Sequence, residues 1–471
     1  MNISKILKSK HNEQIKCKTK ILTHMRLIFF SYLLIILLGG IVLYLPISQN
    51  YNIEHMSFLN CFFTATSAVC VTGLIIAPTA LQWTLFGKIT ILLLIQIGGL
   101  SIIAITSFIF IIIGKKIRLK DRLLLQNTLN QNQFGGIVKM TLTVIKGTLF
   151  FEICGTLILT VYFVFVKHIS FAHALFIGIF HSVSALCNAG FDVLGTNSLI
   201  DYSGDIVVNF VLMSLIIIGG IGFFVWEDVL AKLKDKHHRL HFTSRLAIRT
   251  SIILIVLGAL FFVVIEYNNE KTIGLFSLPH KLLASLFQSV TLRTAGFVSI
   301  DQFGLRDISK LFSSILMMIG GSPGGIAGGI KTTTVVVLIA SIWSTIQGKE
   351  DIELLNRSIP TRLLRKALAV TGIMLSLLFS SSILLSLVET NSTFTHDFLD
   401  ILYECSSALG TVGLTTGITP YLSNIGKLII ISAMIIGRVG PITAIYALSN
   451  IKTNSNSNSF GKLPEADTLI G

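Results

Sequence analysis

The segment Val-Cys-Val-Thr-Gly-Leu at 69–74 decides the fold, because three later segments of the chain follow the same pattern. They read Leu-Cys-Asn-Ala-Gly-Phe at 186–191, Leu-Arg-Thr-Ala-Gly-Phe at 292–297 and Leu-Gly-Thr-Val-Gly-Leu at 409–414. The aligned glycines lie 117, 106 and 117 residues apart, too regular for chance and too long for a solenoid repeat. The sequence therefore predicts a fourfold chain.

The composition is typical of a protein embedded in a lipid bilayer. Hydrophobic residues make up 52% of the chain and charged residues 13%, against about a quarter charged in soluble domains. An eighth apolar run, at 310–345, is broken in its middle. We therefore expect an all-α integral membrane protein with eight transmembrane helices. The seven unbroken runs, each near the roughly 20 residues of a spanning helix, are 27–47, 89–114, 141–166, 205–226, 250–265, 367–388 and 426–449.

The net charge of +14 follows membrane topology rather than a nucleic-acid surface. Most of the 37 lysines and arginines lie in four connectors, at 5–26, 115–122, 232–249 and 349–366. Lys and Arg accumulate in cytoplasmic loops of membrane proteins. This places both termini in the cytoplasm and the four glycine loops toward the outer face of the plasma membrane. The expected environment is the lipid bilayer, and no nucleic-acid partner is expected.

Each quarter of the chain has the same order: an apolar helix, a shorter amphipathic stretch, the glycine loop and a second apolar helix. This is a helix, pore-loop, helix repeat, and four of them would form a pseudo-tetrameric ion pore. The first apolar run lacks a cleavage pattern and is expected to be a retained span. The expected parts are a cytoplasmic tail 1–25, pore repeats 26–120, 121–240, 241–350 with an intramembrane loop 319–331, and 351–450, and a polar tail 451–471.

The glycine loops are the candidate selectivity filter. Each has one residue free to adopt positive φ, so the four loops can place backbone carbonyls around a central axis. The preceding helices, predicted at 57–68, 173–185, 280–291 and 397–408, would aim partial negative charge at a cation there. With one glycine per loop, we expect fewer flexible positions than in a filter with two. The predicted potassium-binding set is Val71, Thr72, Gly73, Asn188, Ala189, Gly190, Thr294, Ala295, Gly296, Thr411, Val412 and Gly413.

The sixth span contains Ile-Gly-Gly-Ser-Pro-Gly-Gly-Ile-Ala-Gly-Gly-Ile-Lys-Thr-Thr-Thr at 319–334. Glycine costs about 1 kcal/mol and proline about 3 inside a helix, so this run should be a loop at membrane depth and a candidate gate. Lys331 adds a positive charge that opposes cation passage, and Arg438 either bonds the loop carbonyls or snorkels to the interface. The predicted gate comprises Gly320, Gly321, Ser322, Pro323, Gly324, Gly325, Gly328, Gly329, Lys331 and Arg438.

Other interpretations of these features stay open. The glycines could be tight packing positions in ordinary helices. The stretch 325–332 nearly fits a phosphate-binding loop, but Ile330 stands where that motif needs glycine and no strand precedes it. A broken helix can also hold the substrate of a secondary transporter, although only one quarter is expected to be broken. Cys70 and Cys187 at equivalent positions could form a metal pair, and Glu152 could pair with Lys146 or bind an ion.

Together these residues resemble the Trk/Ktr/HKT superfamily of potassium transporters. The likeness rests on the four loops, on Ser322-Pro323-Gly324-Gly325 with Lys331-Thr332-Thr333, and on Gly437-Arg438-Val439-Gly440-Pro441. It covers about 26–450. Because the chain starts directly with the first pore unit, it looks most like the membrane subunit of Ktr systems (KtrB).

The resemblance implies partners and a function that composition does not show. It implies a homodimer with one pore per protomer and a cytoplasmic ring of nucleotide-binding RCK domains (KtrA or KtrC type) that drives gating. We therefore expect gated potassium uptake by a chain that is not an enzyme and carries no cofactor. Glycine at all four filter positions favours potassium over sodium, and stimulation by sodium is left open. The alternative is a carrier-type cation symporter with its substrate site at the broken helix.

Overall fold

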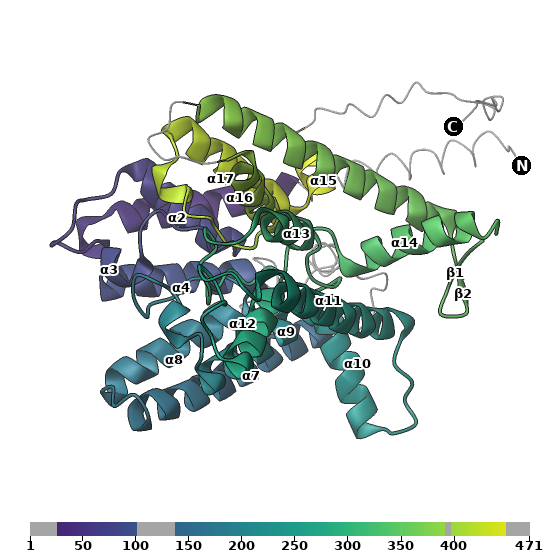
Figure 1. Cartoon of the computed structure of the whole chain (residues 1–471), viewed down its shortest axis with the longest axis horizontal. Coiled ribbons are helices and arrows are strands. Elements are labelled where there is room, and N and C mark those ends of the chain that lie inside the picture. The colour runs from purple at the N-terminus through teal and green to yellow at the C-terminus, as the bar shows by residue number, and fades with distance from the viewer. Residues whose placement is uncertain (1–25, 101–136, 350, 391–396, 449–471) are drawn as a thin grey trace, which may run out of the picture.

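The computed structural model describes residues 26–100, 137–349, 351–390 and 397–448. The two predicted tails and the basic connector at 115–122 lie outside the described residues. Within the described parts the secondary structure is helical apart from one small hairpin, β1 (Ile352–Leu354) and β2 (Arg357–Ile359), which the sequence did not predict. Figure 1 shows this hairpin at the end of the long α14 and α15 helices.

The helices follow the predicted fourfold order. Each quarter has a first helix, a short helix before the glycine loop, and a second helix after it. The first quarter holds the helix Arg26–Tyr44, η1 (Pro46–Ser48), α2 (Phe58–Cys70), α3 (Thr79–Gln82) and α4 (Leu85–Leu100); the second holds α7 (Ile137–Phe165), α8 (Phe171–Leu186), η2 (Ile200–Tyr202), α9 (Ile206–Ile221) and α10 (Phe223–Lys234); the third holds α11 (Phe242–Glu266), α12 (Leu278–Thr291), α13 (Asp307–Met318) and α14 (Thr332–Ile346); the fourth holds α15 (Thr361–Val388), α16 (Phe398–Gly410), η3 (Thr419–Tyr421), α17 (Asn424–Val439) and α18 (Pro441–Leu448).

Two of the short helices before the glycine loops, α2 and α16, begin at side-chain caps. Ser57 accepts a hydrogen bond from the backbone N–H of Asn60 at the start of α2. Asp397 and Asp400 form a reciprocal capping box at the start of α16. These caps satisfy backbone donors that a helix end inside a membrane protein cannot leave unpaired. All four short helices lie within two residues of their predicted bounds.

The outer helices expose apolar side chains, so the protein is embedded in a membrane. On α11, Ile252, Val256 and Leu260 are about half exposed or more, and only 22% of its most apolar window is buried. A face of this size needs an apolar solvent. Among the described residues four helices are long and apolar enough to span a bilayer, or up to six if each bent pair of helices is one span.

Two second helices bend where straight spans are predicted. The run 205–226 was expected to be continuous, but α9 ends at Ile221 and α10 leaves at 100°. The run 426–449 bends by 106° between α17 and α18. Gly222 and Gly440 lie at these bends with φ of +103° and +91°, a conformation that ends a right-handed helix. The expectation that only the third quarter is broken is therefore wrong.

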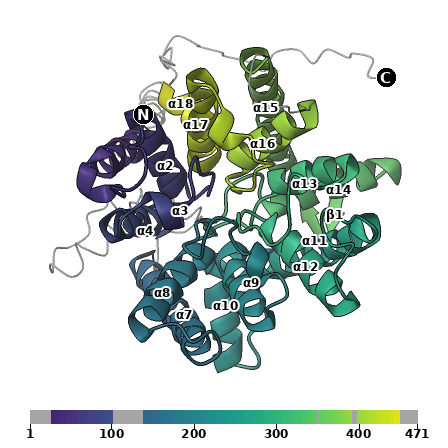
Figure 2. The same ribbon diagram turned by 60° about the vertical axis from the view of Figure 1, so that its left-hand side comes forward.

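The quarters are arranged in a circle. Figure 2 shows them in colour order around a centre where their loops meet. Neighbouring quarters pack through α4 with α8, α9 with α12, and α13 with α16, and α17 closes the circle against α2. Two buried polar contacts lie at these boundaries. Lys310 of α13 pairs with Asp400 of α16 at 2.8 Å, and Lys427 of α17 donates to Asn60 of α2 at 2.9 Å.

Candidate ion path

The four glycines of the candidate filter lie next to one another in a closed ring. A Cβ added to Gly73 would lie 2.5 Å from the Ala189 oxygen, and one at Gly190 would lie 2.8 Å from the Ala295 oxygen. A Cβ added to Gly296 would lie 2.3 Å from the Val412 oxygen. A Cβ added to Gly413 would lie 2.1 Å from the Thr72 oxygen of the first loop, so the ring is closed. Segments more than 100 residues apart thus meet at the same point of their repeats, and side chains are excluded there.

The loop backbones bind back to the helices before them. The N–H of Thr72 donates to the Ser67 carbonyl at 2.8 Å, and the N–H of Val412 donates to the Ser407 carbonyl at 2.8 Å. Ala189 makes the matching bond to Ser184 at 2.7 Å. Among the described residues no hydrogen bond is made to the carbonyls of 71–73, 188–190, 294–296 and 411–413, so these carbonyls remain available as acceptors. Free carbonyls around a narrow axis are the ligands that replace the water shell of potassium.

Each loop contains two left-handed residues, not the single flexible glycine that the sequence suggested. The residue two before each glycine also has positive φ, at Val71 (55°), Asn188 (56°), Thr294 (67°) and Thr411 (53°). The residue between them does not. Alternation of left- and right-handed residues turns successive carbonyls toward one side of the strand. A β-branched residue with positive φ is rare and costs of order 1–3 kcal/mol, which ring packing must offset.

Side-chain hydroxyls on the short helices also hold the loops, and sequence reasoning missed them. Ser67 and Ser407 accept hydrogen bonds from the N–H groups of Gly73 and Gly413, both at 3.0 Å. Ser184 instead donates to the Phe191 carbonyl at 2.7 Å, and Thr291 donates to the Phe297 carbonyl at 2.8 Å. The signal was present in the sequence: a serine stands six residues before Gly73, Gly190 and Gly413.

Replacing Ser407 by alanine should loosen the fourth loop without unfolding the chain. The substitution leaves the buried N–H of Gly413 without its side-chain acceptor, which costs about 1–3 kcal/mol. We expect potassium-over-sodium discrimination in rubidium uptake to fall severalfold. Ser432→Ala is the matched control, because Ser432 is exposed on α17 and bonds only the Leu428 carbonyl of its own helix. Equal discrimination in the two variants would show that the hydroxyl does not hold the filter.

The glycine-rich run forms a loop packed against the other quarters. α13 ends at Met318 and α14 begins at Thr332. The loop N–H groups of Ser322 and Ile326 donate to Gly220 and Gly219 of the second quarter at 3.0 and 3.4 Å. A Cβ at Gly328 would lie 2.2 Å from the Thr411 hydroxyl, so the loop approaches the filter of the fourth quarter directly.

The two ends of this loop are joined. The N–H of Gly320 donates to the Ile330 carbonyl at 3.0 Å, and the N–H of Thr332 donates to the Gly321 carbonyl at 3.2 Å. Gly324 and Gly329 have positive φ, of 74° and 65°. A Cβ at Gly320 would lie 1.8 Å from the Gly328 oxygen. Glycine is therefore required both for the turns and for the close approach of the two strands.

Arg438 of the fourth quarter connects the loop to the first quarter. Its guanidinium donates to the Ile326 carbonyl of the loop and to the Gly98 carbonyl of α4. The hydrogen-bonding alternative is the one observed, and the snorkelling alternative is wrong. Lys331 does not extend away from the loop but donates to the Ala327 carbonyl at 2.6 Å. Both cations thus hold loop carbonyls.

The loop forms one wall of a cavity of about 460 Å³. Other parts of the wall come from the first helix, the end of α4, Phe223 of α10, Lys366 of α15, and the bend between α17 and α18. Lys331, Lys366 and Arg438 line it, and none of the described residues in its wall is a carboxylate. The loop and a cavity lined by these three positive charges therefore lie beside the glycine ring.

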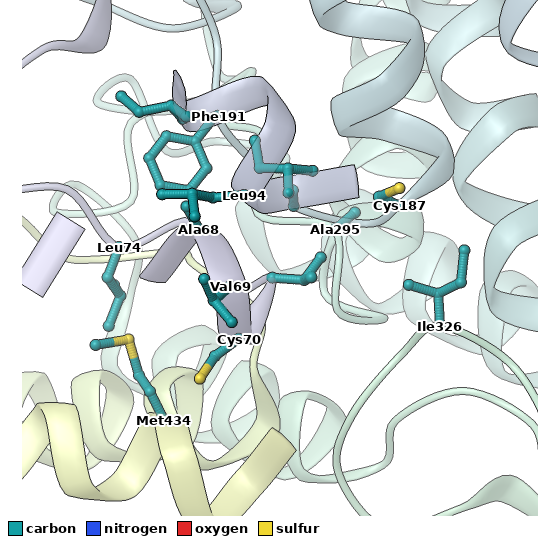
Figure 3. Close-up of a cluster of buried hydrophobic side chains, with 14 of the residues drawn as sticks. Ala68, Val69, Cys70, Leu74, Leu94, Cys187, Phe191, Ala295, Ile326 and Met434 are labelled. Atoms are coloured by element: carbon teal, nitrogen blue, oxygen red, sulfur yellow. The ribbon is translucent and has the colours of Figure 1, made fainter. Parts of the chain in front are cut away.

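The structure gives no support for the metal pair of Cys70 and Cys187 or for an ion pair of Glu152 with Lys146. Arg293 points away from the ring and donates to Ser251 of α11 at 3.0 Å. Figure 3 shows Cys70 directed toward Met434 and away from Cys187, which does not support a metal pair. Glu152 is buried, at 6% exposure, and forms no ion pair with Lys146.

Comparisons with known proteins agree with this geometry. The TrkH family, described as cation transport protein, matches residues 40–459. Ktr system potassium uptake protein B of Bacillus subtilis is 38% identical over 441 residues, covering 94% of this chain and 95% of that protein. Potassium/sodium uptake protein NtpJ of Enterococcus hirae is 38% identical over 452 residues, covering 96% and 98%.

A solved structure has the same fold. The crystal structure of the potassium transporter TrkH from Vibrio parahaemolyticus superposes with a TM-score of 0.70. The match covers 89% of this chain and 85% of that one at 16% sequence identity. At that identity the likeness concerns the fold.

Proposed function

The chain belongs to the TrkH family of cation transport proteins, and from this premise we propose that it takes up potassium through a selective, gated pore in the plasma membrane. The observation that carries the proposal is the closed ring of Gly73, Gly190, Gly296 and Gly413. Within the described residues, the carbonyls of these four loops accept no hydrogen bond. The family is one of transport proteins and not of enzymes.

The pore is built from four repeats and eight spans in this proposal. Four described helices are long and apolar enough to span a bilayer, and the two bent pairs raise that number to six. In this proposal the broken α13/α14 pair and the run that begins with α4 are the other two spans. The carbonyls of residues 71–73, 188–190, 294–296 and 411–413 form the filter. The loop 320–331 with Arg438 is the gate, because the loop lies against Thr411 and is bonded from the second and fourth quarters. Arg438 in turn bonds the first quarter at Gly98.

The partners belong to the same proposal. Relatives named as Ktr system proteins support a system of more than one component. In this proposal a cytoplasmic RCK-type ring (KtrA or KtrC type) acts on a homodimer of this chain. The basic connectors at 232–249 and 349–366 suit the cytoplasmic side. Sodium is proposed as an activator because one relative is named a potassium/sodium uptake protein.

Uptake in a bacterium that lacks its own potassium uptake systems tests this function. The chain is expressed with and without a Ktr regulatory subunit, and rubidium or potassium uptake is measured at limiting external potassium. We expect uptake that rises with the regulatory subunit and saturates without fixed sodium stoichiometry. Strictly stoichiometric sodium coupling would instead favour the carrier-type symporter. No uptake despite verified membrane insertion would contradict potassium as the transported ion.

A further inference from the structure

A carboxylate in the middle of α10 and two imidazoles from the connector between α10 and α11 converge. Asp228 of α10 lies 2.8 Å from Nε2 of His238 and 2.7 Å from Nδ1 of His241, through the same oxygen, Oδ1. One ligand atom from each of the three residues lies within 4.8 Å of the other two. The transport function makes no use of this group.

The three side chains combine a buried acid with accessible bases. The Asp228 side chain is 1% exposed, whereas His238 and His241 are 29% and 59% exposed. The second carboxylate oxygen, Oδ2, accepts the backbone N–H of His241 at 2.8 Å, which fixes the carboxylate plane. The His241 ring packs edge-on against Phe224 at 5.4 Å. The buried ligand is thus held in place, and the open side gives an ion a way in.

We propose that Asp228, His238 and His241 bind a divalent transition metal ion of the zinc class. Two imidazole nitrogens and a carboxylate oxygen match the donors that zinc takes in three-ligand sites, which keep a fourth position for water. Zinc bonds of about 2.0–2.2 Å place tetrahedral ligand atoms roughly 3.3 Å apart. The observed 2.7 and 2.8 Å would open by about half an ångström, which side-chain rotation supplies.

The metal would tie α10 to the start of α11 and so act on the intramembrane loop. His241 is the N-cap of α11, and Asp228 lies on α10 about one and a half turns after its first residue, Phe223. The N–H of Phe223 donates to the Gly324 carbonyl of the loop at 3.0 Å. Restraining α10 through Asp228 therefore restrains the helix end that holds Gly324. This coupling, unlike the binding, rests on the proposed function.

Zinc binding is measured on the full chain purified with a histidine-free tag and stripped with chelator. Equilibrium dialysis with zinc alone should give one ion per chain, and cobalt in its place should show the d–d absorption of a tetrahedral site. Asp228→Asn keeps an oxygen that can accept the His241 N–H but weakens the ligand. The Asp228→Asn and His238→Ala variants should bind zinc at least tenfold more weakly than the wild type. The control is His237→Ala, which changes an exposed neighbour and should bind zinc like the wild type.

Two results would overturn the site: no bound zinc on the wild type at micromolar concentration, or equal binding by all four proteins. The second would mean that the cluster only ties the connector to α10. Rubidium flux in liposomes is measured separately, and zinc should change it at least twofold in the wild type and in His237→Ala only. Zinc bound without a change in flux overturns the coupling. Absence of flux from every sample that binds zinc counts against the proposed function and not against the site.

Discussion

Replacing Gly73 by serine is expected to lower potassium-over-sodium selectivity at least tenfold. Gly73 has φ of +95°, a conformation that costs a residue with a Cβ about 1–2 kcal/mol. The added Cβ would lie 2.5 Å from the Ala189 oxygen of the neighbouring loop, and that oxygen belongs to backbone and cannot rotate away. The carbonyl ring must therefore change shape. Selectivity depends on where these carbonyls stand, so sodium should compete better.

The measurement is competition by sodium in rubidium uptake, at matched amounts of protein in the membrane. Gly372→Ser is the control, because Gly372 lies within α15 and a Cβ there has no atom within 4 Å. We expect this control to keep the wild-type ratio. Full uptake with unchanged ion competition in Gly73→Ser would remove Gly73 from the filter.

Replacing Arg438 by alanine is expected to raise rubidium flux in the absence of a regulatory partner tenfold or more. The substitution removes the bonds to the Ile326 and Gly98 carbonyls. A hydrogen bond to a charged group contributes about 1.5–3 kcal/mol, so loss of even one shifts the loop equilibrium by about a factor of ten or more. The loop position observed against Thr411 should then be less populated.

The Lys366→Ala variant distinguishes two effects of Arg438: its hydrogen bonds to the loop and its positive charge in the cavity. Lys366 lines the same cavity as Arg438, so its loss removes one positive charge there and no bond to the Ile326 carbonyl. We expect little change in flux from Lys366→Ala and a clear rise from Arg438→Ala. Equal rises in both variants would mean that charge, rather than the hydrogen bonds of Arg438, limits passage.

Removal of 321–329 provides an independent variant of the gate. Because Gly320 already bonds Ile330, the two ends of the deletion lie beside each other and can be rejoined. This variant should conduct rubidium without the regulatory ring. Continued dependence on that ring would argue that the loop is not the gate.

The sequence predicted the helical, membrane-embedded class, the four short helices and the break after Met318. These features follow from the properties of individual residues and short segments. Long apolar runs are stable in the bilayer, and glycine and proline destabilise helices. The transport family could also be recognised from motifs alone. The bends at Gly222 and Gly440 were missed although the sequence carries a signal for each, because Gly219 and Gly220 precede the first and Pro441 follows the second. The β1/β2 hairpin was missed because its strands are three residues each.

The tertiary structure alone decided which groups meet. No local pattern shows that Gly413 closes a ring with Gly73, that Arg438 reaches Gly98, or that Asp228 faces two histidines across a turn. Positive φ at Val71 and Thr411 likewise opposes the preference of those residues and is imposed by packing around the ring. Hydrophobicity and backbone freedom act at each position separately, whereas these contacts join segments up to 340 residues apart and exist only once the quarters have packed.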